Sequence, residues 1–171
     1  MKVLFLDIDG VLCTHNSDNY SEQDDKFDDK ACKNLKKIID ETGCKLVLTS
    51  SWRLYSSYIK LLLSLLKPYG ITRLDFLGKT KSLLSRAQEI SEFLSSHKEI
   101  TNYIVLDDEQ IVSKLIPSDK IIYTQAKSGI TNEITKKCIK ILMHKRFDLG
   151  YTFSAKKTRR YSRFFCRQKR D

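Results

Sequence analysis

Two kinds of hydrophobic pattern alternate along the chain. Short runs of consecutive apolar residues predict buried strands, because strands covered on both faces of a sheet are apolar throughout. Longer segments with an apolar residue every three or four positions predict helices with one buried face. The expected strands cover residues 3–6, 45–48, 103–106 and 121–123, and the expected helices cover residues 28–42, 54–67, 82–97 and 131–145.

Local signals refine this division. The first helix begins at Asp28 or Asp29, because acidic residues suit the positive end of a helix, and it ends at Gly43. Residues 69–80 show no clear period, and a short strand at 73–77 is the only element expected there. Strands that alternate with amphipathic helices predict a three-layer, Rossmann-like α/β fold with a parallel sheet.

Polar residues follow three of the expected strands directly. In parallel α/β sheets, ligands bind outside the carboxyl ends of the strands. We therefore expect these residues to form one site, whereas turn capping alone explains three polar pairs less well than one. The pairs are Asp7 and Asp9, Thr49 and Ser50, and Asp107 and Asp108.

The spacing of Asp7 and Asp9 favours a bound cation. Side chains two residues apart on an extended segment point to the same side, so the two carboxylates repel each other. Mg²⁺ prefers hard oxygen ligands and is commonly held by carboxylates together with a phosphate. Asp107 and Asp108 can complete such a site. Mg²⁺ is therefore the expected cofactor.

Several motifs resemble those of a known family. The strings DIDGVL, LVLTS and VLDD resemble the first, second and fourth motifs of the haloacid dehalogenase (HAD) superfamily, and they stand at residues 7–12, 46–50 and 105–108. A second set is similar to the compact HAD domains of "Swiss Army knife" RNA-repair proteins. It comprises TSSWR, RAQEI, LDD and GIT, which begin at residues 49, 86, 106 and 129. The resemblance covers about residues 1–145.

This resemblance implies a phosphatase with a covalent intermediate. Asp7 would be the nucleophile that forms an aspartyl-phosphate, and Asp9 would protonate the leaving oxygen and later activate water. Thr49, with the backbone N–H of Ser50, would hold a phosphate oxygen. The second aspartate favours ester hydrolysis, because dehalogenases lack it and transport ATPases carry Thr there. The implied metal ligands are Asp7, the carbonyl of Asp9, Asp107 and, in support, Asp108.

The same family places a Lys or Arg at the start of a helix before the fourth motif. Arg86 is the favoured candidate, since an arginine can grip phosphate with two N–H groups. Lys79 and Lys81 are the alternatives, but a solvated surface charge is the better reading of these two. For Arg86 a solvated charge on a helix face is the competing reading. Arg53 is expected to contact substrate at the mouth of the site, and Trp52 to pack in the core.

A further apparent phosphate motif does not fit. Gly78-Lys79-Thr80 has the ending of a Walker loop, which also needs a glycine five residues before Gly78. That position is Arg73, so we do not expect a Walker loop.

Composition bounds the class of protein. The chain has 171 residues, of which 41% are hydrophobic, and this fits one globular domain. Its five cysteines are scattered without a CxxC pair, so we expect neither a disulfide framework nor a zinc site. With no apolar run long enough to cross a bilayer, we expect an intracellular protein, cytoplasmic or, in a eukaryotic host, nuclear. The motif spacing leaves room only for a minimal cap, and hence for an open site.

Charge is concentrated near the end of the sequence. The net charge is +10, and residues 151–171 hold eight basic residues and one acid. We therefore divide the chain into a HAD-like phosphatase domain, 1–150, and a basic tail, 151–171. Cations interleaved with aromatic residues are typical of nucleic-acid contacts. A solubilising tail or a nuclear-import signal is the alternative.

The sequence thus favours one hypothesis and leaves a second open. The first is a Mg²⁺-dependent phosphomonoester hydrolase whose phosphorylated substrate is a nucleic-acid end or a nucleotide, with no membrane partner. The second is a catalytically weak HAD-fold protein that binds nucleic acid through its basic tail. The pattern does not indicate an oligomeric state.

Overall fold

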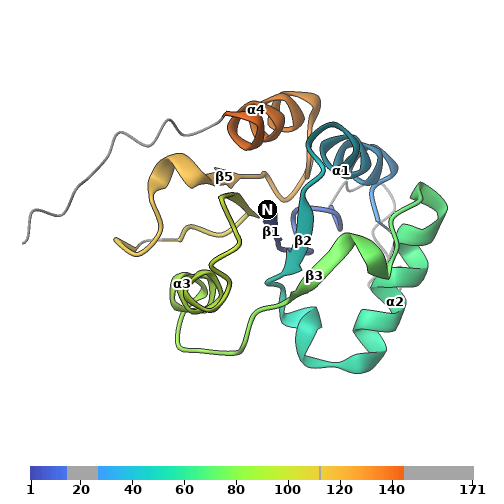
Figure 1. Cartoon of the computed structure of the whole chain (residues 1–171). Helices are drawn as coiled ribbons and strands as arrows, with labels where there is room; N and C mark the ends of the chain where they lie inside the picture. The colour runs from blue at the N-terminus through green and yellow to red at the C-terminus, as the bar shows by residue number, and fades with distance from the viewer. Residues whose placement is uncertain (15–26, 112, 145–171) are drawn as a thin grey trace, which may run out of the picture.

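The computed structural model describes residues 1–14, 27–111 and 113–144. Five parallel strands form one sheet in the order β3-β2-β1-β4-β5 (Figure 1). The strands are β1 Lys2–Leu6, β2 Lys45–Leu48, β3 Phe76–Lys79, β4 Asn102–Asp107 and β5 Ile121–Tyr123. The α-helices are α1 Asp29–Thr42, α2 Ser56–Leu66, α3 Arg86–Ser96 and α4 Asn132–Met143. This arrangement confirms the predicted three-layer, Rossmann-like α/β fold.

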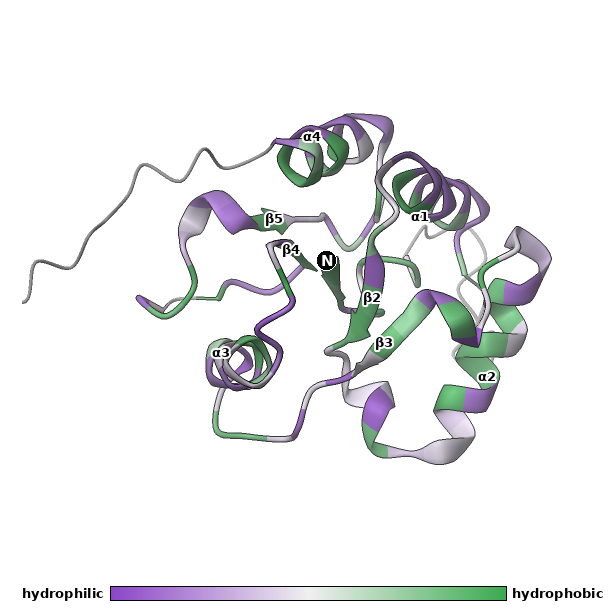
Figure 2. Cartoon of the chain, in the orientation of Figure 1, coloured by the Kyte–Doolittle hydropathy of each residue, from purple (hydrophilic) through white to green (hydrophobic). Residues whose placement is uncertain are grey.

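Alternation along the strands divides the core into two parts. Leu4 and Leu6 of β1 belong to the cluster that α1, α2 and α4 cover, whereas Val3 and Phe5 face α3. Figure 2 shows apolar strands at the centre, with polar residues on the outward sides of α1 and α4. The central strands β1, β2 and β4 are thus apolar on both sides, which explains why their sequences are continuous apolar runs.

Helix α1 has the boundaries that its sequence predicts. The side chain of Asp28 accepts a hydrogen bond from the Ala31 backbone N–H, which is the usual N-cap interaction. Gly43 ends the helix in the left-handed conformation, with φ of 65°, and its N–H donates to the carbonyl of Ile39.

Helix α3 begins later than its hydrophobic period predicts. Ser85 caps it, so the helix starts at Arg86 rather than at residue 82. Leu84 is 96% exposed and lies outside the apolar face to which the pattern assigned it. The backbone N–H of Leu83 donates to the buried carboxylate of Glu89, and this bond turns the preceding chain away from a helical path.

Two other boundaries differ from prediction. The helix expected at 54–67 corresponds to α2, which starts at Ser56, after a separate short 3₁₀ helix at Ser51–Leu54. The expected strand at 73–77 is instead a capped 3₁₀ turn, Arg73–Asp75, followed by β3. The remaining 3₁₀ segments are Lys67–Tyr69 and Ser118–Lys120.

The described residues contain no separate cap domain. All elements between β2 and β4 belong to the sheet or to the helices and turns that border it. No helix among the described residues has the length and apolarity of a bilayer span. Cys13, Cys32, Cys44 and Cys138 are free thiols. The tail at 151–171 and the boundary at 150 lie outside the described residues, so the division into domain and tail stays a prediction.

Candidate active site

Polar side chains form a row across the carboxyl edge of the sheet. The N–H of Asp7 donates to Leu106 O at 3.0 Å, and the N–H of Thr49 donates to Leu6 O at 2.9 Å. The N–H of Thr80 donates to Leu48 O at 3.0 Å, so the ladder continues one residue past β3. With Asp107 at the end of β4, these hydrogen bonds align Thr80, Thr49, Asp7 and Asp107 on neighbouring strands. Side chains in register share a face of a sheet, here the face that α3 covers.

Arg86 reaches this row from the first position of α3. Its Nη1 donates to Asp7 Oδ1 at 2.9 Å and lies 3.6 Å from Asp107 Oδ2. A cation at a helix start is unusual, because the helix dipole favours anions there. The two carboxylates supply that negative charge in this site.

Burial dominates the electrostatics of Asp7. Its residue is 6% exposed, and desolvation raises the pKa of its carboxyl from 3.8 to about 7. Arg86 opposes this rise, whereas the negative charges of Asp107 and Asp9 add to it. Burial also raises the pKa of Asp107. The site therefore holds more negative charge than a single guanidinium balances.

Three carboxylates are close enough to hold one cation. Oxygen atoms of Asp7, Asp107 and Asp108 all lie within 4.8 Å of one another. Asp107 Oδ2 is buried and makes no hydrogen bond, which leaves an oxygen suited to a metal. Hard oxygen donors are the ligands that Mg²⁺ prefers, so these residues fit that ion.

The loop after β1 is fixed against the neighbouring acids. Gly10 has φ of 65°, and a Cβ at this position would overlap the carboxylate of Asp108. Thr124 Oγ1 donates to the carbonyl of Gly10 at 2.8 Å, and the N–H of Ile130 donates to Val11 O at 3.1 Å. Only glycine combines this conformation with so close an approach. The loop thereby brings the first motif against Asp108.

A family model agrees with this geometry. The model described as the HAD domain in Swiss Army Knife RNA repair proteins matches residues 3–134. The chain belongs to this family. The match confirms the resemblance that the motifs carried, and family membership supports a phosphatase-type or RNA-repair function. Neither the curated proteins nor the solved structures yield a match to the chain.

Within this HAD domain, most of the predicted site residues lie together, and some lie apart from them. Asp7, Thr49, Arg86, Asp107 and Asp108 come together at the carboxyl edge. The side chain of Asp9 is exposed and does not join the three clustered carboxylates, although its charge acts on Asp7. Ser50 is buried, and its Oγ accepts a hydrogen bond from the N–H of Trp52. Trp52 packs in the core as expected, in ring contact with Phe27 and Tyr58.

Arg53 differs from the substrate contact that the sequence predicted. Its guanidinium donates to the carbonyls of Thr49, Ser50, Thr80 and Lys81 and to Glu89 Oε1. An arginine has five N–H groups, so these five acceptors leave none for a phosphate. Arg53 is instead a buried structural residue. Its hydrogen bonds connect the carboxyl ends of β2 and β3 to helix α3.

The two alternative cations lie elsewhere. Lys79 Nζ donates to the carbonyl of Arg53 at 2.7 Å, and Lys81 pairs with Glu92 at 2.6 Å. Arg86 is thus the candidate for the third motif that contacts the carboxylates.

Sequence reasoning missed Thr80 and Glu89 as members of the site. Thr80 stood inside the rejected Walker string, and the strand before it was expected three residues too early. Its sequence signal is weaker than that of Thr49, because Gly78 and Lys79 separate Thr80 from the apolar pair at 76–77, whereas Thr49 directly follows an apolar run. Glu89 was noted only as a neighbour of Arg86, because its burial depends on Arg53, which is distant in sequence.

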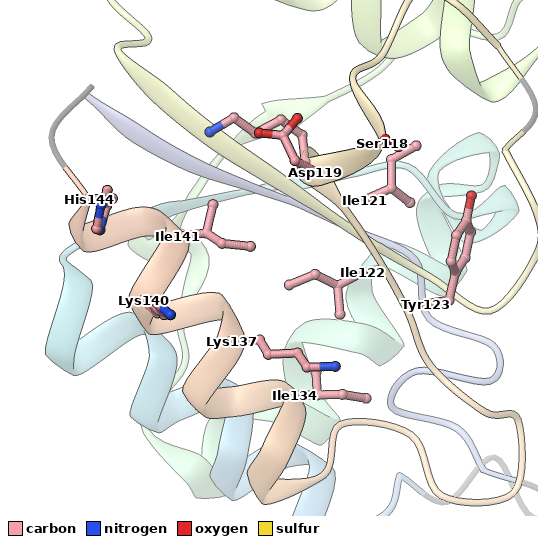
Figure 3. Close-up of a pocket in the computed structure, with 11 residues that line it drawn as sticks. Ser118, Asp119, Ile121, Ile122, Tyr123, Ile134, Lys137, Lys140, Ile141 and His144 are labelled. Carbon is pink, nitrogen blue, oxygen red and sulfur yellow. The ribbon is translucent and has the colours of Figure 1, made fainter. Parts of the chain in front are cut away.

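A separate hollow of about 740 Å³ lies between β5 and α4, as Figure 3 shows. Isoleucine side chains from the strand and the helix line it, together with Lys137 and Lys140 of α4 and His144, the residue that follows this helix. It contains none of the clustered carboxylates. It is therefore not the candidate active site, although basic side chains, Lys120 among them, border it.

Proposed function

We propose that this chain is a Mg²⁺-dependent phosphomonoester hydrolase that acts through an aspartyl-phosphate at Asp7. The observation that carries the proposal is the buried carboxylate of Asp7, aligned between Thr49 and Asp107 and contacted by Arg86. A nucleophile, hydroxyl donors and a cation in one buried row match the needs of phosphoryl transfer. Membership of the HAD family supports the same reading.

The reaction would proceed in two displacements. In the first, Asp7 attacks phosphorus, the bond from phosphorus to the ester oxygen breaks, and Asp9 gives its proton to the leaving oxygen. In the second, Asp9 takes a proton from water, the water attacks phosphorus, and inorganic phosphate leaves. Asp7 is then free again as a carboxylate. Covalent catalysis of this kind divides one difficult step into two easier ones.

Other residues would hold the phosphoryl group. Thr49 Oγ1 is buried without a partner, so a phosphate oxygen can accept its hydrogen bond. The backbone N–H of Ser50 would add a second donor, and Arg86, which donates to Asp7, would balance negative charge. Asp7, Asp107 and Asp108, with the carbonyl of Asp9, would hold Mg²⁺. The ion would supply charge neutralisation and favour the ionised form of Asp7.

The substrate class follows from family membership and from access to the site. The family takes its name from RNA-repair proteins, and the described residues include no cap domain over the site. A phosphate on a large molecule can then approach Asp7. We therefore infer that nucleic-acid ends or nucleotides are the substrates and that the basic tail, residues 151–171, contacts the rest of the strand.

A phosphatase assay tests the chemistry. Wild-type protein should hydrolyse p-nitrophenyl phosphate with Mg²⁺ and lose this activity in EDTA. Asp7→Asn should abolish turnover, whereas Asp40→Asn, at an exposed position of α1, should retain it. Turnover that persists in Asp7→Asn would contradict the proposed nucleophile. Screening phosphorylated oligonucleotides, nucleotides, phosphopeptides and sugar phosphates would then rank substrates.

A second function is favoured by the basic border of the hollow between β5 and α4. Lys137, Lys140 and His144 stand there together, so the protein could bind a nucleic acid without useful turnover. Lys137→Glu with Lys140→Glu should then weaken oligonucleotide binding about tenfold at low salt. Lys136→Glu on the same helix, outside the hollow, is the matched control. If the double variant and the Lys136→Glu control bound the oligonucleotide with equal affinity, this surface would be excluded as the binding site.

A further inference from the structure

Two threonine hydroxyls lie side by side in the site without any partner. Thr49 Oγ1 and Thr80 Oγ1 are buried, and neither makes a hydrogen bond, with the other or with any other group. A buried hydroxyl without a partner is costly, because it has given up its hydrogen bonds to water, so its persistence calls for an explanation. Among the described residues, the other buried side-chain oxygen without a hydrogen bond is Asp107 Oδ2. The candidate metal site explains that oxygen, because a cation can bind there.

The ladder places the two threonines as neighbours. Leu48 pairs with Lys79, and Thr49 and Thr80 each stand one residue further along. The N–H of Thr80 donates to Leu48 O, so the pairing extends to this point. Neighbouring strands are about 4.8 Å apart, and side chains in register share one face. A single oxygen atom between the two hydroxyls can therefore accept a hydrogen bond from both.

Arg53 fixes the separation of this pair. Its Nη1 donates to Thr49 O at 2.5 Å, and its Nε donates to Thr80 O at 3.1 Å. The same guanidinium is held by Glu89 Oε1 at 2.6 Å, in a pair that is almost fully buried. One planar group thus holds the backbone of both threonines and ties them to α3, which carries Arg86.

We propose that Thr49 and Thr80 together bind one non-bridging oxygen of the phosphoryl group, with Thr80 as a second substrate-binding residue and Arg53 as the residue that positions both. This inference rests on the proposed function. It explains why both hydroxyls are unpaired in the protein alone. It also explains why Arg53 is buried beside the site without a donor left for the substrate.

Thr80→Val tests the pair, because it removes the hydroxyl and keeps the shape. The probe is inorganic phosphate with Mg²⁺, measured by calorimetry and by thermal shift on the full chain. Thr80→Val should weaken phosphate binding about tenfold or more, the effect of one hydrogen bond to a charged oxygen. Its melting temperature without ligand should equal or exceed that of wild type, because no protein hydrogen bond is lost. Thr80→Ser should restore binding.

Thr135→Val is the matched control. Thr135 is also buried, but its hydroxyl donates to Thr131 O at 2.9 Å in α4. This variant should lose stability and keep its phosphate affinity, the reverse of Thr80→Val. A lower melting temperature for Thr80→Val, or phosphate affinity equal to that of wild type, would overturn the proposal.

The positioning role of Arg53 has its own readout. Arg53→Lys keeps a positive charge but cannot donate to both threonine carbonyls. In the Arg53→Lys background, Thr80→Val should weaken phosphate binding much less than it does alone. Full additivity of the two changes would show that Arg53 does not act through Thr80.

These measurements separate the inference from the proposed function. Phosphate binding needs no turnover, so an inactive protein that binds phosphate through both threonines would support the pair and contradict the hydrolase. An active hydrolase whose phosphate affinity is unchanged by Thr80→Val would contradict the pair alone. Failure of the wild-type protein to bind phosphate would also contradict the proposal that Thr49 and Thr80 bind a phosphoryl oxygen.

Discussion

Replacing the buried nucleophile should stabilise the metal-free protein, and the gain should depend on pH. Burial raises the pKa of Asp7 from 3.8 to about 7. Between these values the folded protein binds a proton that the unfolded chain releases, so folding stability falls as pH rises. Asp7→Asn cannot ionise and avoids this loss. Asp7 is 6% exposed, so solvent screens its charge little.

The magnitude follows from the size of the shift. One pKa unit corresponds to about 1.4 kcal/mol, so the two units between pH 5 and pH 7 correspond to about 3 kcal/mol. Asp7→Asn also changes the contact with Arg86, and this shifts the difference in unfolding free energy between variant and wild type by a constant amount. The pH dependence of that difference remains. Between pH 5 and pH 7, the unfolding free energy of Asp7→Asn should therefore rise by about 3 kcal/mol relative to that of wild type.

Urea unfolding of both proteins in EDTA at several pH values measures this difference. Asp40→Asn, which replaces an exposed carboxylate on α1, should show no such trend. Mg²⁺ should raise the stability of wild type at pH 8 and have little effect on Asp7→Asn. If the difference between variant and wild type were the same at pH 5 and pH 8, burial of Asp7 would not have the electrostatic effect argued above.

Two further substitutions test the supports of the site. Glu89→Gln leaves the buried guanidinium of Arg53 without its counter-charge and should lower the free energy of unfolding by about 3 kcal/mol. Glu92→Gln, in an exposed pair on the same helix, should change it far less, as chemical denaturation would show. Gly10→Ala should displace Asp108 and weaken Mg²⁺ binding about tenfold in a calorimetric titration, and unchanged affinity would contradict the role given to this glycine.

Much of the fold could be predicted because its signals are local. The central strands β1, β2 and β4 are buried on both faces and so appear as short apolar runs, and α1 carries its own cap residues at both ends. The start of α3 was wrong because Leu83 and Leu84 continue a helical period that Ser85 interrupts. That choice depends on a hydrogen bond to Glu89, a tertiary contact that no local pattern reveals.

The same distinction applies to the site. The aspartates and Thr49 could be predicted as a group, since parallel strands place their ends at one edge. Arg53 was misread because a cation next to a phosphate motif resembles a ligand-binding group. Only the fold shows that its acceptors come from two other segments. Thr80 was missed for a related reason, because its neighbour Thr49 is 31 residues away in sequence.

The most direct test of the central claim is to identify the phosphorylated residue. Asp9→Asn should slow hydrolysis of the intermediate, whereas p-nitrophenolate leaves without a proton, so the aspartyl-phosphate should accumulate with p-nitrophenyl phosphate and Mg²⁺. Acid quenching and peptide mass spectrometry should then find one phosphoryl group on Asp7. A phosphoryl group on another residue, or turnover by wild type with no labelled residue in Asp9→Asn, would contradict the account.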